Sequence, residues 1–178
     1  LGDYFKKEQL PWIFELATKV LGLDPKRLYV TVFAGNASVP KDTDSIKIWQ
    51  EIFSSVGIEA QVANYASSVG VPASPAGGCI FTYDAHKNWW SRSGEPEKMP
   101  PGEPGGPDSE VFFDFGEELK IHERSLWKNE KCHPNCDCGR FLEIANSVFM
   151  QYKKAILGLL LHILLKEQEK RFCLKKMQ

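Results

Sequence analysis

Apolar residues recur at helical spacing in two segments of the chain. They are Leu10, Ile13, Phe14, Ala17, Val20 and Leu21 in the first segment, and Ile46, Trp49, Ile52, Phe53 and Val56 in the second. Each set forms one stripe, which predicts two helices that each bury a single face. Pro11 fits only an opening turn, so we expect the first helix to begin near residue 9 or 10 and to end at Gly22. Thr43 or Asp44 can cap the second helix, which ends at Gly57.

β-Branched and aromatic residues gather in short runs that predict strands. The runs cover residues 28–33, 58–65, 79–83, 110–115 and 140–152. Small residues at 66–78 and a Gly/Pro-rich segment at 94–107 predict loops, and the second cannot be a regular helix or a central strand. Helices and strands do not alternate regularly, and no glycine-rich loop joins a strand to a helix. We therefore expect an α+β fold with an antiparallel sheet flanked by helices.

The composition is that of a globular protein of one domain. The chain has 178 residues, of which 43% are hydrophobic and 25% charged. The formal net charge of -1 gives no general attraction to nucleic acid, so any contact with RNA requires a local patch. The longest apolar stretch, Ala155 to Leu165, is too short to cross a bilayer, and the N-terminus has no secretory signal. We expect a cytoplasmic protein without a membrane partner, and the absence of an initiator Met suggests that the chain begins inside a longer protein.

Three of the five cysteines lie within seven residues. Cys132, Cys136 and Cys138, together with the adjacent His133, have the residue types and spacing of a zinc knuckle at residues 132–138. Neighbouring Cys132 and His133 rarely both bind one ion, so His122 or Cys79 is an alternative fourth ligand. The other interpretation is that the three cysteines are reduced thiols on a polar loop.

One polar residue interrupts an apolar pattern in the long predicted strand at 140–152. Under strict alternation Asn146 shares a face with Leu142, Ile144, Val148, Met150 and Tyr152, whereas Glu143 lies on the opposite face. A buried amide without partners costs about 1–3 kcal/mol. A ligand can provide those partners, and so can a neighbouring loop or strand edge. By the same alternation, one of Trp89 and Trp90 points to the core.

Four stretches occur in an order that resembles the alanyl-tRNA synthetases, which are class II aminoacyl-tRNA synthetases. They are Leu1–Glu8, Asn88–Trp90, Gly106–Gly116 and Phe141–Tyr152. The resemblance covers about residues 1–154 and implies part of the aminoacylation catalytic domain. It departs from the family at Ala145, where a Trp is common, and in residues 155–178, which we expect to form an atypical helical tail. The fold is expected to be incomplete, because the motifs that carry the ATP-binding arginines are not present.

The resemblance implies a ligase that activates alanine with ATP and Mg²⁺ and transfers it to tRNA(Ala). It implies that the alanine pocket is lined by Trp90, Glu143, Asn146 and Val148, with Trp90 over the substrate methyl group. Without the ATP-binding arginines, the isolated chain is expected to be inactive. The alternative function is a catalytically inactive, synthetase-like binding module that a structural zinc ion stabilises.

Overall fold

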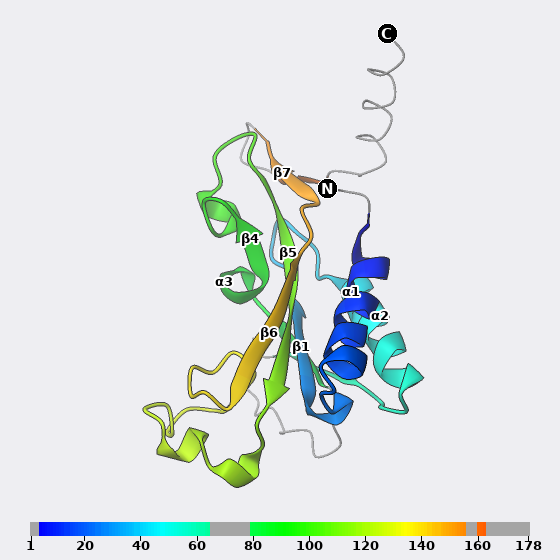
Figure 1. The fold of residues 1–178 in the computed structure, drawn as a ribbon. Helices are drawn as coiled ribbons and strands as arrows, with labels where there is room; N and C mark the ends of the chain where they lie inside the picture. Colours follow the sequence, from blue (N-terminus) through cyan, green and yellow to red (C-terminus); the bar gives the residue numbers. More distant parts are fainter. Residues whose placement is uncertain (1–3, 65–78, 156–159, 163–178) are drawn as a thin grey trace.

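The computed structural model describes residues 4–64, 79–155 and 160–162 (Figure 1). Three helices occur in this part of the chain: α1 (Lys6–Glu15), which a π-helical turn (Leu16–Val20) continues, α2 (Thr43–Ser55) and α3 (Ala85–Asn88). The strands are β1 (Leu28–Phe33), β2 (Gln61–Asn64), β3 (Cys79–Tyr83), β4 (Trp89–Ser91), β5 (Pro104–Asp114), β6 (Phe141–Val148), β7 (Tyr152–Lys154) and β8 (Leu160–His162). The predicted α+β class, with helices flanking a sheet, is confirmed.

The described strands form one mixed sheet in the order β2-β3-β1-β5-β7-β8, and β4 and β6 also pair with β5. Strand β5 is antiparallel to β1, β4, β6 and β7, as the sequence predicted. By contrast, β3 is parallel to both β1 and β2. Helix α2 lies between β1 and β2 in the chain and returns it to the same end of the sheet, so that these two strands run in the same direction on either side of β3.

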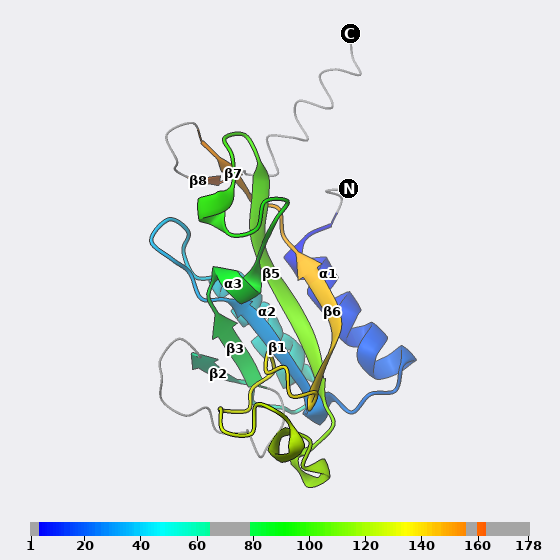
Figure 2. The same cartoon turned by 90° about the vertical axis from the view of Figure 1, so that its left-hand side faces the viewer.

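The main hydrophobic core lies between the sheet and the two long helices, which cover one face of the sheet (Figures 1 and 2). Val30 and Val32 of β1 point into this core, where Trp49 and Phe53 of α2 are fully buried. Alternate residues of the strands point to the other face. There an aromatic cluster forms from Tyr29, Phe81, Tyr83 and Phe112. The two long helices, α1 and α2, therefore do not cover the second face of the sheet, which carries other side chains.

Helix α1 begins earlier than predicted, at Lys6, and Pro11 lies in its second turn. The prediction was wrong because tertiary contacts hold the first turn. Lys6 Nζ forms a buried ion pair with Asp42 Oδ1 at 2.6 Å. The backbone N–H of Phe5 donates a hydrogen bond to the Glu8 carboxylate at 3.1 Å. These contacts offset the backbone hydrogen bond that the proline cannot donate.

Helix α2 is capped by Asp42, and not by Thr43 or Asp44 as predicted. The Asp42 carboxylate accepts hydrogen bonds from the Ser45 backbone N–H at 3.1 Å and from the Ser45 hydroxyl at 2.7 Å. The same carboxylate pairs with Lys6, so one buried aspartate joins the first turns of both helices. The tertiary contact with Lys6 favours Asp42 as the cap over the two candidates that the sequence analysis named.

Strand β5 begins at Pro104, inside the segment that was predicted to be a loop. Only glycine fits at position 106 of this strand, because a Cβ atom there would overlap the carbonyl oxygen of Phe149. That close approach occurs where the predicted strand 140–152 breaks into β6 and β7. A glycine that reads as a loop signal thus permits two backbone segments to approach each other.

Two sequence predictions fall wholly or partly outside the described residues. The loop at 66–78 is one of them. In the predicted helical tail, 155–178, residues Leu160–His162 instead form β8 and pair with β7. None of the helices in the described ranges has the length and hydrophobicity needed to span a bilayer.

Replacing Asp42 with alanine removes the cap of α2 and leaves Lys6 buried without its counter-ion. Breaking one side of a buried ion pair costs about 3–5 kcal/mol. We expect Asp42→Ala to lower the free energy of unfolding by about that amount in chemical denaturation. Exposed Asp44 is the matched control, and Asp44→Ala should change stability by less than about 0.5 kcal/mol. Equal effects of the two substitutions would contradict the assigned cap.

Candidate functional site

A cluster of polar side chains lies on the face of the sheet opposite α1 and α2, toward the viewer in Figure 2. Its members are Thr31, Asn88, Asp108, Glu110, Glu143 and Asn146. The strand register places Glu110 directly opposite Thr31 on one side and Asn146 on the other. Three polar residues therefore form a row across β1, β5 and β6. We call the six residues the polar cluster.

A β-bulge in β6 brings Glu143 to the same face as Asn146. Val111 pairs with Ala145 but Phe112 pairs with Glu143, so Ile144 is an extra residue in β6. The prediction that Glu143 and Asn146 lie on opposite faces is therefore wrong, because strict alternation assumes an unbroken ladder.

The bulge also removes the apolar face that Asn146 was predicted to interrupt. Ile144 packs against the helix-side core, whereas 51% of Leu142 and 37% of Val148 is exposed. Asn146 itself is exposed at the edge of the polar cluster. The partners that we expected Asn146 to need are instead the carboxyl groups beside it, Asp108 and Glu143.

Hydrogen bonds fix the centre of the polar cluster. Glu110 Oε2 accepts from Thr31 Oγ1 at 2.7 Å and from Asn135 Nδ2 at 3.0 Å. Asn88 Nδ2 donates to Thr31 Oγ1 at 2.8 Å and to Asp108 Oδ1 at 3.0 Å. Within the described part of the chain the Asn88 side-chain oxygen has no hydrogen-bond partner. Buried polar groups are normally satisfied, so this acceptor is available to a donor that enters the cluster.

Three carboxyl groups close together give the polar cluster an acidic character. The pKa of Asp108 is raised to about 7, mainly by burial and also by the charges of Glu110 and Glu143, while hydrogen bonds from Asn88 and Asn146 act against the rise. Burial and the charge of Glu110 also raise the pKa of Glu143. A cationic ligand such as a primary ammonium group would relieve this repulsion. The cluster is therefore suited to bind a small ligand with a positive charge.

Asp108 is the functional candidate that the sequence analysis missed. Acidic residues at alternate positions of one strand, Asp108 and Glu110, are a usable signal because they must share a face. Asp114, which continues the alternation, has a structural role instead. Its carboxylate pairs with Arg140 Nε at 2.8 Å and Nη2 at 2.9 Å, and it accepts from the Gly116 N–H at 2.8 Å.

Trp89 and Trp90 point in different directions, as predicted. Trp89 is buried and packs against Phe33 and Tyr152, each with ring centroids 5.7 Å from its own. Trp90 is 47% exposed and lies opposite Gly106, two residues along β5 from Asp108. Val148 pairs with Asp108 on the other side of β5. An exposed ring and a partly exposed aliphatic side chain therefore flank the acidic groups.

The cysteine-rich segment forms a second cluster, in which His133 does not take part. Ligand atoms of His122, Cys136 and Cys138 all lie within 4.8 Å of one another. Cys132 Sγ lies 3.8 Å from Cys138 Sγ. The ring of His133 turns away, and its Nδ1 is hydrogen-bonded to the hydroxyl of Tyr83 at 2.8 Å. His122, the alternative ligand, thus lies beside the cysteines in place of His133.

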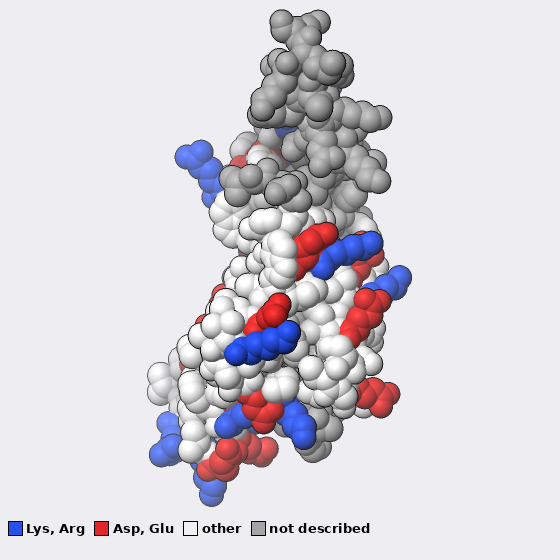
Figure 3. Space-filling model, turned by 45° about the vertical axis from the view of Figure 1, so that its right-hand side comes forward, with Lys and Arg blue, Asp and Glu red and all other residues white. Residues whose placement is uncertain are grey.

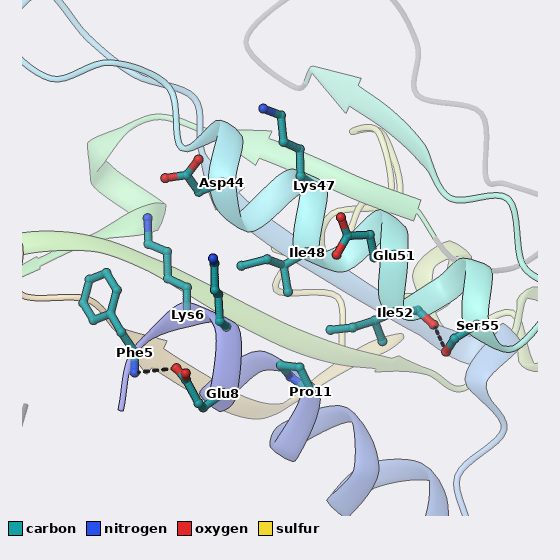
Figure 4. A pocket seen from close by; sticks show the side chains of 11 residues that line it. Phe5, Lys6, Glu8, Pro11, Asp44, Lys47, Ile48, Glu51, Ile52 and Ser55 are labelled. Carbon is teal, nitrogen blue, oxygen red and sulfur yellow. Dashed lines mark hydrogen bonds between the residues drawn. The ribbon is translucent and has the colours of Figure 1, made fainter. Parts of the chain in front are cut away.

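A cavity of about 1040 Å³ opens between α1 and α2, on the face of the sheet opposite the polar cluster (Figure 4). Ile48 and Ile52 lie between the helices, while Lys47 extends away from α1. The surface around these helices mixes positive and negative side chains and shows no patch of one sign (Figure 3). This groove brings together no group of buried polar side chains like the polar cluster, so size alone does not make it the functional site.

The raised pKa of Asp108 predicts a dependence of stability on pH. Its pKa in the folded protein, about 7, exceeds its ordinary value of 3.8. Between these values the folded protein binds more protons than the unfolded chain, so this group's contribution to stability falls as pH rises. We expect Asp108→Asn to raise the free energy of unfolding by up to about 4 kcal/mol near pH 8 and to change it little near about pH 4. Denaturation of both proteins across this range, with Asp44→Asn as control, measures it; parallel pH profiles would contradict the assignment.

Comparisons with known proteins agree with the resemblance found in the sequence. A family model described as "tRNA synthetases class II (A)" matches residues 1–170, and so continues past residue 154. Similar proteins include the alanine--tRNA ligases of Treponema denticola (36% identical over 160 residues, 89% of this chain), Treponema pallidum (37% over 156 residues, 86%) and Rubrobacter xylanophilus (35% over 155 residues, 86%). The chain spans only 21%, 20% and 14% of their respective lengths. With the mixed sheet and its flanking helices, these matches establish that the chain belongs to the class II (A) tRNA synthetase family.

Proposed function

We propose that the polar cluster is the amino-acid-binding wall in the aminoacylation core of an alanine–tRNA ligase. The observation that carries the proposal is the row Thr31–Glu110–Asn146 across three strands, with Asp108 and Glu143 beside it. This row lies in a chain whose similar proteins are named alanine--tRNA ligases. Fold membership alone would not assign a substrate, and the chemistry of this face supplies the further support.

Each part of alanine has a counterpart on this face. The substrate ammonium group suits the carboxyl groups of Asp108, Glu110 and Glu143, whose mutual repulsion it would relieve. The Asn146 amide can donate to the substrate carboxylate and accept from its ammonium group. The exposed ring of Trp90 and the side chain of Val148 offer apolar surface for the methyl group. A rigid ring at that place would also exclude longer side chains.

ATP, Mg²⁺ and tRNA(Ala) complete the proposed reaction. The alanine carboxylate attacks the α-phosphate of ATP, which gives alanyl-adenylate and pyrophosphate, and the tRNA then takes the alanyl group. Phosphoryl transfer needs positive groups around the triphosphate. The polar cluster is acidic and would repel it, so we assign ATP to other parts of the longer protein, whose expected location is the cytoplasm.

A second candidate function is a synthetase-like binding module that has lost catalysis. The cluster of His122, Cys136 and Cys138 favours it, because a metal-stabilised loop can support a fold that no longer performs chemistry. Alanine-dependent pyrophosphate exchange by the longer protein that contains this chain distinguishes the two. Exchange supports the ligase, and its absence in a folded protein supports the module.

In that longer protein, Asn146→Ala should weaken the response to alanine and leave the response to ATP nearly unchanged. Loss of a hydrogen bond to a charged group is worth about 1.5–3 kcal/mol, or roughly ten- to a hundred-fold in kcat/KM for alanine. Pyrophosphate exchange at varied alanine measures it. Ser147→Ala is the matched control, because the neighbouring Ser147 is buried and faces Gln9 of α1. An unchanged alanine response for Asn146→Ala would remove Asn146 from the site.

The 178-residue chain by itself should not catalyse the exchange of pyrophosphate into ATP or the charging of tRNA(Ala). The reason is that an arginine of the kind that neutralises a triphosphate is worth several orders of magnitude in rate, and the polar cluster provides none. Incubation with alanine, ATP, Mg²⁺ and labelled pyrophosphate tests this. Alanine-dependent exchange that Asn146→Ala abolishes would show that the chain carries its own ATP site.

A further inference from the structure

The connection between β5 and β6 is long and has little regular structure. Between Asp114 and Phe141 it contains only two short 3-10 turns, Glu117–Leu119 and His122–Arg124. Loops of this length inside a compact domain normally have a function or need something to hold them. The buried residues of this connection are not mainly aliphatic. They include His122, Cys136, Cys138 and Arg140.

Two distances among these side chains match those of a tetrahedral metal site. In zinc sites with Zn–S of about 2.3 Å and Zn–N of about 2.0 Å, two sulfur ligands lie about 3.8 Å apart, and a sulfur and a nitrogen ligand about 3.5 Å apart. Cys132 Sγ and Cys138 Sγ are separated by 3.8 Å. Cys136 Sγ and His122 Nδ1 are separated by 3.7 Å. Two of the ligand pairs therefore have the spacing of a Cys₃His centre. His122, Cys136 and Cys138 form the compact part of the group, and Cys132 approaches it through Cys138.

Groups around the four side chains orient them as metal ligands require. His122 Nε2 lies 3.0 Å from the carbonyl oxygen of Glu130. An N–H at that atom donates to the carbonyl and leaves Nδ1 free to bind the ion, the usual arrangement for a zinc-bound histidine. The Arg140 backbone N–H donates to Cys138 Sγ at 3.5 Å, which supports a thiolate. Apart from half-buried Cys132, the ligands are shielded from solvent.

We propose that Cys132, Cys136, Cys138 and His122 bind one zinc ion, and that this ion holds Asn135 against the polar cluster. His133, the ligand first suggested by the sequence, is excluded from the set because its Nδ1 is hydrogen-bonded to the hydroxyl of Tyr83. Asn135 lies between two of the ligands in the chain and donates to Glu110 Oε2 at 3.0 Å. The zinc centre is thus a positioning device for the polar cluster. It does not depend on the proposed alanine chemistry.

Elemental analysis of the full chain, purified under reducing conditions without chelator, tests the ligand set. We expect about one zinc per chain. His122→Ala and Cys136→Ser should reduce the zinc content to near zero, whereas the matched control His133→Ala should retain it. Loss of zinc in His133→Ala together with its retention in His122→Ala would overturn the set. A folded wild-type chain that contains no zinc under these conditions would overturn the site itself.

Cobalt substitution tests the same site without relying on variants that fail to fold. Wild-type chain loaded with Co²⁺ should show the intense visible absorption of tetrahedral cobalt with thiolate ligands. An octahedral spectrum would contradict a Cys₃His centre.

Hydrogen exchange followed by mass spectrometry tests the positioning role. Removal of zinc by a chelator should increase exchange in residues 117–140 and in β6, while α1 and α2 keep their protection. Unchanged exchange in these segments of the folded, metal-free chain would show that the ion does not order them.

Discussion

The structure depends on strand β5, which is paired along both of its edges. Ser109 and Glu110 each face a residue of β1 on one side and of β6 on the other, and farther along Gly105 lies between β4 and β7. Every backbone group of such a strand must find its partner in a fixed register. The alternation along β5 then divides its side chains between two environments. Val111 enters the hydrophobic core, whereas Asp108 and Glu110 enter the polar cluster.

The polar cluster is costly to the fold, which is consistent with a site that serves a ligand. Burial beside other carboxyl groups raises the pKa of Asp108, and a sheet built only for stability would place apolar residues there. Hydrogen bonds from Thr31, Asn88 and Asn135 stabilise the arrangement from three separate elements. Asn135 comes from the cysteine-rich connection, so the two clusters are linked by a direct contact. A change in that connection would reach the proposed amino-acid wall through Glu110.

The bulge at Ile144 shows how one residue changes the chemistry of a strand. It places Glu143 beside Asn146, and it leaves both Ile144 and Ala145 packed against the helix-side core. Ala145 stands where the resembling family commonly has Trp. In the structure a side chain at this position packs between the sheet and the helices. Substitution there would therefore act on the packing of α1 and α2 against the sheet.

Local physical chemistry in the sequence was enough to determine β1, β3, the apolar stripes of both long helices and the alternation of Trp89 and Trp90. These features depend on propensities and periodicities that act within a few residues of one another. Only the tertiary structure decided the start of α1 at Lys6, the strand at Gly106, the face of Glu143 and the position of His122, rather than His133, beside the cysteines. Each of these depends on a partner far along the chain: Asp42, Phe149, Val111 with Phe112, and Cys136. A single sequence read in local windows does not contain those distances, because they arise only when the strands pair and the helices pack.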